Sequence, residues 1–244
     1  KRLYPAQYLR SDQLLLMPTF QQDFNMIHPQ RKILIIDYKL GNLFSVNQAL
    51  TNIGLNVNIT SNADEIQSAD AIVLPGVGAF SDAMNNLRDL NLINPIKKFV
   101  DSGKPFLGIC LGLQLLFTDS EEFGLSKGLG LVKGRVKRFN NNNRDDETRK
   151  VPQIAWNQIH KINGNSWENT PLNGIKEGEF MYFVHSFYVD PEEPVGLSQT
   201  IYDGKIYTSS IQKNNLFACQ FHPEKSAAEG LKIYNNWAII NNLK

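Results

Sequence analysis

The sequence predicts an α/β protein built on a doubly wound, mostly parallel sheet with helices on both faces and an added antiparallel section in the C-terminal half. Three observations support this fold class. Between residues 31 and 117, short apolar runs alternate with helical patterns, as in repeated strand-helix units. The runs within residues 32–37 and 106–109 are continuous, which is typical of strands covered on both faces. After residue 117, glycines and shorter apolar runs replace the alternation.

The 244 residues fit one large domain better than two. We predict that residues 1–30 are a disordered N-terminal extension, because Pro5, Pro18 and Pro29 interrupt any regular element. A partner-docking arm is the alternative interpretation. Residues 31–244 form the predicted folded domain.

The first half begins with a strand at residues 32–37 and a helix that Asn42 or Ser45 caps and Gly54 ends. The alternation then predicts strands at 56–60, 71–74 and 106–109, a short helix from residue 64, a glycine-rich turn at 75–80 and helical stretches up to residue 102. In such sheets ligands bind beyond the carboxyl ends of the strands, where this turn and residue 110 both fall.

The second half is predicted to contain antiparallel strands within residues 151–160 and 196–221, with a hairpin turn at Asp203-Gly204. The composition of residues 140–150 predicts a polar loop with a solvated tip at 140–143. A final helix at 225–244 carries an apolar stripe that we expect to pack on the sheet, formed by Leu231, Tyr234, Trp237 and Ile240.

Composition excludes several classes of function. A formal net charge of +1 gives no reason to propose a nucleic-acid or membrane partner. Two cysteines make neither a disulfide framework nor a zinc site, and a lone reactive thiol fits a reducing cytoplasm. No apolar run approaches the roughly 20 residues of a membrane span. We therefore expect a cytoplasmic protein.

Cys110 is the candidate nucleophile. Gly108 and Gly112 flank it in a Gly-X-Cys-X-Gly turn between an apolar strand and a helical pattern, as glycines flank the nucleophile in a strand-turn-helix elbow. Free N–H groups at the start of the helix would favour a thiolate there. Cys219 has no such glycines around it and is expected to be a buried strand residue.

His222 and Glu224 provide the candidate proton-transfer pair. They follow an apolar strand and are separated by Pro223, so in an extended chain both side chains would share one face. A carboxylate can hold one imidazole nitrogen and leave the other free to exchange a proton with a thiol.

The glycine-rich turn supplies a third element of the site. Its Gly76 and Val77 could aim a backbone N–H at an oxyanion, with the N–H of Leu111 as a second donor. A phosphate-binding turn is the rival interpretation, although the turn lacks the lysine and the spacing of a P-loop.

Together these motifs resemble class I (triad) glutamine amidotransferases. More narrowly, the chain from about residue 32 onward is similar to the glutaminase subunit of imidazole glycerol phosphate synthase from histidine biosynthesis, so that residues 31–244 would be a glutamine amidotransferase type 1 domain. The motifs that carry this resemblance are Asp37-Tyr38 with Gly41-Asn42-Leu43, Pro75-Gly76-Val77-Gly78-Ala79-Phe80, Gly108-Ile109-Cys110-Leu111-Gly112 with Gln114, Val151-Pro152 with Trp156-Asn157, Tyr182-Phe183-Val184-His185-Ser186, and Gln220-Phe221-His222-Pro223-Glu224-Lys225-Ser226.

The resemblance implies a specific chemistry. Cys110 would attack the side-chain amide of glutamine, and His222, oriented by Glu224, would deliver a proton to the departing ammonia. Water would then cleave the thioester. The resemblance also assigns the oxyanion site to Gly76, Val77 and Leu111, and glutamine binding to Gln114, His185, Ser186 and Phe187.

The resemblance further implies a partner. Ammonia would pass to a (βα)8-barrel cyclase subunit, in a heterodimer that makes imidazole glycerol phosphate and an aminoimidazole carboxamide ribotide. No metal or organic cofactor is implied. We expect the turn at residues 75–78 to have an inactive backbone conformation, unsuited to binding the oxyanion, until the partner and its ligand bind.

The chain departs from the family pattern at Lys39, at Gln153-Ile154-Ala155, at Phe187 and in residues 1–30. Several of these positions lie where the partner would dock, so they leave alternatives open. One alternative is a related subunit that supplies ammonia for amidating a surface-polysaccharide sugar. The others are a stand-alone γ-glutamyl thiol hydrolase and a non-enzymatic scaffold.

Overall fold

The structure is a computed structural model that describes residues 31–139, 150–162 and 164–244. The predicted extension at residues 1–30 and the predicted loop tip at 140–143 lie outside the described residues. In the described part of the chain, no helix is long and apolar enough to cross a membrane.

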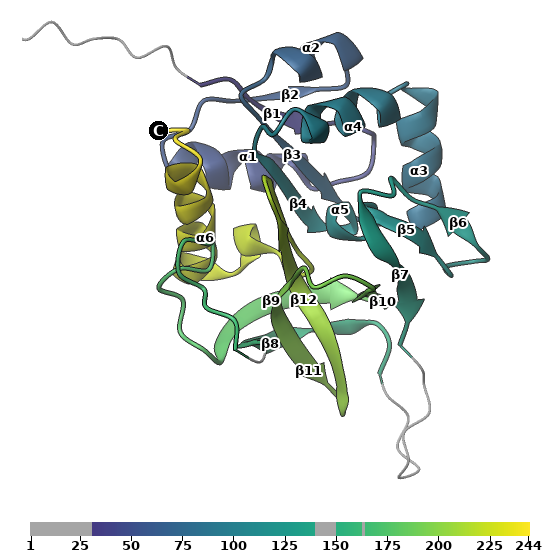
Figure 1. Ribbon diagram of the computed structural model, residues 1–244, viewed down its shortest axis with the longest axis vertical. Helices are drawn as coiled ribbons and strands as arrows, with labels where there is room; N and C mark the ends of the chain where they lie inside the picture. Colours follow the sequence, from purple (N-terminus) through teal and green to yellow (C-terminus); the bar gives the residue numbers. More distant parts are fainter. Residues whose placement is uncertain (1–30, 140–149, 163) are drawn as a thin grey trace, which may run out of the picture.

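Five strands form the parallel half of a single large sheet (Figure 1). Their spatial order is β2-β1-β3-β4-β13, and each neighbouring pair is parallel. The bounds are β1 Ile33–Ile36, β2 Val57–Thr60, β3 Ala71–Gly76, β4 Phe106–Cys110 and β13 Leu216–Cys219. The chain thus returns near its end to insert β13 beside β4.

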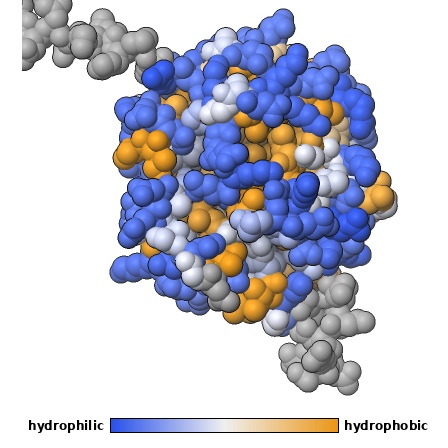
Figure 2. All heavy atoms as spheres, in the orientation of Figure 1, coloured by the Kyte–Doolittle hydropathy of each residue, from blue (hydrophilic) through white to orange (hydrophobic). Residues whose placement is uncertain are grey.

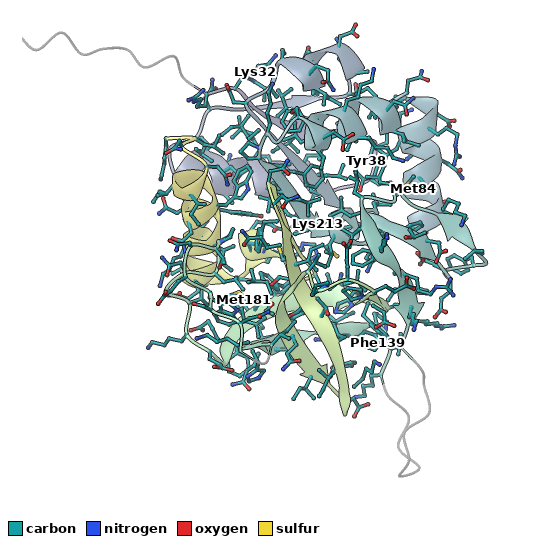
Figure 3. All side chains as sticks on the ribbon, in the orientation of Figure 1. Lys32, Tyr38, Met84, Phe139, Met181 and Lys213 are labelled. Carbon is teal, nitrogen blue, oxygen red and sulfur yellow. The ribbon has the colours of Figure 1, made fainter. Side chains whose placement is uncertain are left out.

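Helices cover both faces of this half, as predicted. Alternate residues of β1 point to opposite faces, so Ile33 and Ile35 join one hydrophobic cluster while Leu34 and Ile36 join the other. The first cluster contains residues of α1 (Leu43–Asn52) and α6 (Ala227–Ile240). The second contains residues of α2 (Ala63–Ser68), α3 (Phe80–Asp89) and α4 (Ile93–Asp101). Figure 3 labels Met181, which belongs to the first cluster, and Met84, which belongs to the second.

The second half of the chain extends the sheet with mainly antiparallel strands. Beyond β13 the order continues β12-β10-β7-β5-β6, and a ribbon of β8 and β9 joins through β11. The bounds are β5 Phe117–Ser120, β6 Ser126–Lys127, β7 Val132–Arg138, β8 Gln153–Lys161, β9 Glu179–His185, β10 Phe187–Pro191, β11 Gly196–Tyr202 and β12 Lys205–Lys213. The predicted hairpin turn joins β11 to β12, with positive φ at both Asp203 and Gly204.

Three expectations need correction. The helix after Cys110 is a single turn, α5 (Leu111–Gln114), because the buried apolar run continues into strand β5. No strand was anticipated at the positions of β5, β6, β7, β9 and β10. Ile240 is 40% exposed and does not belong to the packed stripe of α6, since the helix ends there and only its inner residues, such as Trp237, reach the core.

Candidate active site

Cys110 occupies the sharp turn that its flanking glycines predict. Its φ of 54° and ψ of −106° lie in a region that side chains rarely adopt. A Cβ at position 112 would lie 1.8 Å from the Leu74 carbonyl oxygen, and one at position 108 would lie 2.9 Å from the Ala218 Cβ. Both positions therefore require glycine, and the turn holds the thiol at the carboxyl end of β4.

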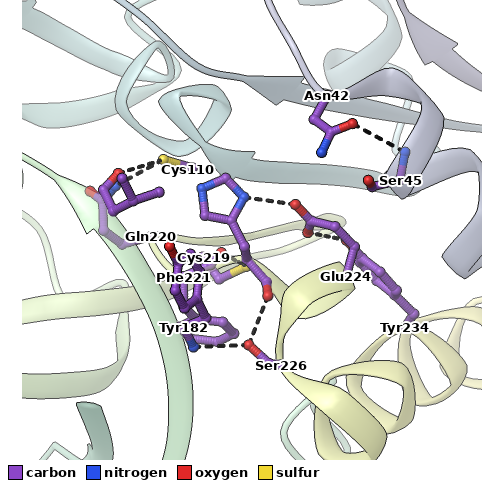
Figure 4. A network of polar contacts seen from close by, with 12 residues as sticks. Asn42, Ser45, Cys110, Tyr182, Cys219, Gln220, Phe221, Glu224, Ser226 and Tyr234 are labelled. Atoms are coloured by element: carbon purple, nitrogen blue, oxygen red, sulfur yellow. Dashed lines mark hydrogen bonds and ion pairs between the residues drawn. The ribbon is translucent and has the colours of Figure 1, made fainter. Parts of the chain in front are cut away.

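His222 and Glu224 come to this edge because β13 pairs with β4, with Cys219 opposite Ile109. The His222 Nδ1 lies 2.7 Å from the Glu224 Oε1, and the Tyr234 hydroxyl donates to Glu224 Oε2 at 3.1 Å (Figure 4). The predicted pairing forms, but not along an extended strand. Glu224 belongs to a 3-10 turn at Pro223–Lys225, which brings the carboxylate back to the ring.

The environment of His222 favours the imidazolium form. Burial alone lowers its pKa, but the charge of the nearby Cys110 and the hydrogen-bonded Glu224 carboxylate outweigh burial and raise the pKa to about 10. The Nε2 of His222 is buried and bonds to no other described residue. Its proton is therefore available on the side of the sulfur, where a reacting molecule would bind.

A cavity of about 250 Å³ opens beside the sulfur. It brings together seven predicted site residues, Val77, Cys110, Leu111, Gln114, His185, Ser186 and Phe187. Gly76, His222 and Glu224 do not line it, although Gly76 ends β3 opposite Cys110 and the charge of Cys110 acts on His222. Gly78, Glu122, Pro152 and Val184 complete the lining.

The Phe187 carbonyl organises one wall of this cavity. It accepts hydrogen bonds from the Gln114 Nε2 at 3.0 Å and from the His185 Nδ1 at 2.7 Å. Burial lowers the pKa of His185 to about 4, so its ring is neutral at neutral pH and carries its single proton on Nδ1. The His185 Nε2 lies 3.2 Å from the Tyr207 hydroxyl, which donates to the Gln153 Oε1 at 3.1 Å.

Comparison with known proteins identifies the family. The family model described as glutamine amidotransferase class-I matches residues 34–240, which is most of the chain. The chain belongs to the class I glutamine amidotransferases. The resemblance drawn from its motifs is therefore confirmed.

Curated relatives and solved structures agree with this assignment. This amidotransferase is 46% identical over 208 residues to "Imidazole glycerol phosphate synthase subunit HisH 1" of Legionella pneumophila (strain Lens), covering 84% of this chain and 98% of that protein. It is 48% identical over 211 residues to the HisH subunit of Aquifex aeolicus, covering 84% and 95%. The structure titled "Structure of PurLQS from Thermotoga maritima" matches with a TM-score of 0.65 at 19% identity, covering 88% of this chain and 100% of that one. This last likeness confirms the predicted fold class.

One pocket residue of the amidotransferase was missed in the sequence. Glu122 is buried, its Oε2 accepts the Phe80 N–H at 2.7 Å, and burial raises its pKa. It follows another glutamate, Glu121, in a stretch where two adjacent acids are typical of a solvated turn. Glu122 differs from an ordinary solvated acid in lining the same cavity as Cys110, and the sequence does not reveal this proximity.

The described residues contain no group of three or more His, Cys, Asp or Glu side chains arranged to hold a metal ion. The lining of the amidotransferase pocket contains the Cys110 thiol, the His185 imidazole, the Glu122 carboxylate and the Gln114 amide.

Proposed function

We propose that this chain is the glutaminase subunit of imidazole glycerol phosphate synthase in histidine biosynthesis, which hydrolyses glutamine and supplies ammonia to a cyclase partner. The observation that carries the proposal is the elbow cysteine between an amino-acid-sized cavity and a hydrogen-bonded His222–Glu224 pair. The names of relatives at 46–48% identity support this pathway over sugar amidation.

The reaction follows from the positions of the three side chains. The Cys110 sulfur attacks the amide carbon of glutamine, and the Nε2 proton of His222 passes to the departing ammonia. Water then adds to the γ-glutamyl thioester, giving up a proton to His222 and releasing glutamate and the thiol. The Glu224 carboxylate holds Nδ1 at 2.7 Å and stabilises the imidazolium both before its Nε2 proton leaves and after water returns one.

The cavity also suits the amino-acid end of glutamine. The buried Glu122 carboxylate can pair with the α-ammonium group. Both N–H bonds of the Gln114 amide are used within the protein, on Phe187 and Gln220, so its oxygen is the group left to accept from substrate. The backbone of Ser186 and Phe187 lies on the remaining side and can hold the α-carboxylate.

The register of the sheet supports an idle resting state. Ile72 N–H donates to the Pro105 carbonyl at 3.1 Å. In a parallel ladder alternate residues bond to one neighbour, so Gly76 also faces β4, whereas Pro75, which has no N–H, faces away. Because Gly76 pairs with Cys110, we infer that the Gly76 carbonyl is directed toward Leu111, whose N–H is the donor that the oxyanion requires.

Activation then requires the Gly76–Val77 peptide to rotate, so that the carbonyl leaves and an N–H takes its place. Gly78, with a φ of 103°, gives the turn the conformational freedom for this change. We infer that docking of the cyclase and its ligand favours the rotated turn. This keeps the enzyme from wasting glutamine when no acceptor is present.

The partner surface is the outer face of the β8–β9 ribbon. Every second residue of each strand points to this face. Three of these residues are large, apolar and about half exposed, namely Ile154, Trp156 and Phe180. Val184 continues the face into the cavity beside Cys110. On the side of the molecule in Figure 2, hydrophilic residues predominate and apolar ones form separate small patches. Because Val184 connects this face to the cavity, a cyclase bound here would receive ammonia directly from the site. We propose that the cyclase is a (βα)8 barrel and that the two subunits form a cytoplasmic heterodimer.

The experiment is a reconstitution with the histidine-pathway cyclase subunit, using either glutamine or ammonium as the nitrogen source. Cys110→Ala should abolish the glutamine-dependent product and leave the ammonium-dependent product unchanged. Equal loss with both sources contradicts the proposal. Glutaminase activity that does not rise when partner and acceptor are added contradicts the idle resting state, and turnover of γ-glutamyl peptides without any partner favours a thiol hydrolase.

A further inference from the structure

We propose that Gln220 is a positioning residue that donates a hydrogen bond to the Cys110 sulfur and couples the nucleophile to the substrate-binding wall. The proposal deepens the proposed glutaminase function and rests on it for its catalytic meaning. Gln220 directly follows strand β13, two residues before His222, and its side chain is fully buried. Its Nε2 lies 3.6 Å from the Cys110 Sγ (Figure 4).

The orientation of the Gln220 amide follows from hydrogen-bond accounting. The Phe187 carbonyl can only accept, so the Gln114 group that faces it at 3.0 Å must be the amide nitrogen. The second N–H of Gln114 points to Gln220 at 3.1 Å, which makes the Gln220 group on that side the oxygen. The Gln220 NH2 group is then left to face the sulfur.

This chain of donors has a chemical consequence. The orientation of each amide is set by the hydrogen bond before it in this series. The series begins at the Phe187 carbonyl, in the wall proposed to bind glutamine. An N–H aimed at sulfur stabilises a thiolate more than a thiol. The Cys110 Sγ also lies 3.8 Å from the Val184 carbonyl, a contact that only the thiol form can use as a donor. Gln220 therefore biases the sulfur toward its nucleophilic form.

The test measures the pH dependence of Cys110 alkylation by iodoacetamide, with the modified peptide identified by mass spectrometry so that Cys219 is read separately. The titratable groups that act on the sulfur are His222, Tyr38, Tyr207 and Cys219. A change at Gln220 removes none of them. Gln220→Met keeps the length and burial of the side chain but has no N–H donor.

We expect the pH midpoint of alkylation to move upward by about 1 unit in Gln220→Met, the effect of losing one hydrogen bond to a charged group. Gln212→Met is the matched control, because Gln212 lies on the neighbouring strand β12, opposite Phe217, and its amide oxygen has no hydrogen-bond partner among the described residues; the midpoint should not change in this variant. If Gln220→Met does not fold, as judged by circular dichroism, Gln220→Glu takes its place. Its carboxylate has the same shape and should move the midpoint further upward.

A folded Gln220 variant with the wild-type midpoint would overturn the proposal. In the reconstituted complex, Gln220→Met should lower kcat for glutamine more than it raises KM, and ammonium-dependent activity should be unchanged. The alkylation result does not depend on glutamine turnover. If wild-type protein fails to hydrolyse glutamine, the proposed function fails, while the midpoint shift still decides the role of Gln220.

Discussion

Replacing Gly112 by alanine tests whether the nucleophile turn depends on close contact between two backbones. The new Cβ would lie 1.8 Å from the Leu74 carbonyl oxygen, whereas ordinary contact begins at 3.4 Å, so one of the two segments must move by about 1.6 Å. Leu74 lies in the middle of β3, hydrogen-bonded between β1 and β4. The easier movement is therefore that of the turn, which carries Cys110.

The displacement should cost both stability and rate. Overpacking of this kind destabilises by about 1–3 kcal/mol, and each kcal/mol lowers Tm by about 2–4 °C in a domain of this size. A displacement of about 1 Å at a nucleophile costs on the order of 100-fold in rate. We therefore expect kcat for glutamine to fall at least that far at a temperature where the variant is folded.

Gly54→Ala separates the two effects. Gly54 has a φ of 88° with open space around it, so alanine there costs about 1–2 kcal/mol through backbone strain, but it follows α1 at the opposite end of the strands from Cys110. Tm should fall while kcat stays at the wild-type value. A Gly112→Ala enzyme with wild-type kcat and wild-type alkylation of Cys110 would refute the reasoning.

Three further predictions concern protonation and docking. Glu224→Gln should lower kcat by about 10²–10⁴-fold and lower the pKa of His222 from about 10; an NMR titration that still gives about 10 would contradict its role. His185, whose pKa falls from 6.5 unfolded to about 4 folded, binds its proton in the unfolded chain first, so wild-type protein should lose up to about 3 kcal/mol as pH falls across that window. Chemical denaturation should follow a flatter pH profile in His185→Gln, and an equally steep profile would count against this assignment. Trp156→Ala should weaken cyclase binding in calorimetry at least 10-fold, whereas Ile239→Ala, at an exposed position of α6, should leave affinity unchanged.

The parts of the fold that the sequence predicts well are those with a single local signal. Continuous apolar runs correspond to β1, β3 and β4, which are buried on both faces. Gly108 and Gly112 predict the turn at Cys110, because no other residue fits beside Leu74 and Ala218. Strand β7 was not anticipated, although its first five residues alternate between buried and exposed.

Strand β9 shows why other elements were missed. Met181 and Phe183 are buried in the core, yet Phe180 on the opposite face is 49% exposed and equally apolar. Both faces are hydrophobic, so the alternation that identifies a half-buried strand is absent. An outer face that serves a partner would remove that signal, which agrees with the docking surface proposed for the β8–β9 ribbon.

The site itself was predictable to the extent that its residues lie in motifs. Cys110, His222 and Glu224 could be paired because each follows a strand, although the 3-10 turn that carries Glu224 could not be anticipated. Glu122 and the role of Gln220 depend on contacts with residues 42 and 110 positions away in the sequence. No local pattern records contacts of that range.

Under the proposed mechanism, the insertion of β13 between β4 and β12 determines when the enzyme can become active during its synthesis. A ribosome makes Cys110 more than a hundred residues before His222, and the strand that delivers the imidazole is among the last to be completed. Until then a growing chain has its thiol but no proton donor beside it. Catalytic competence thus reports that the whole domain has been made.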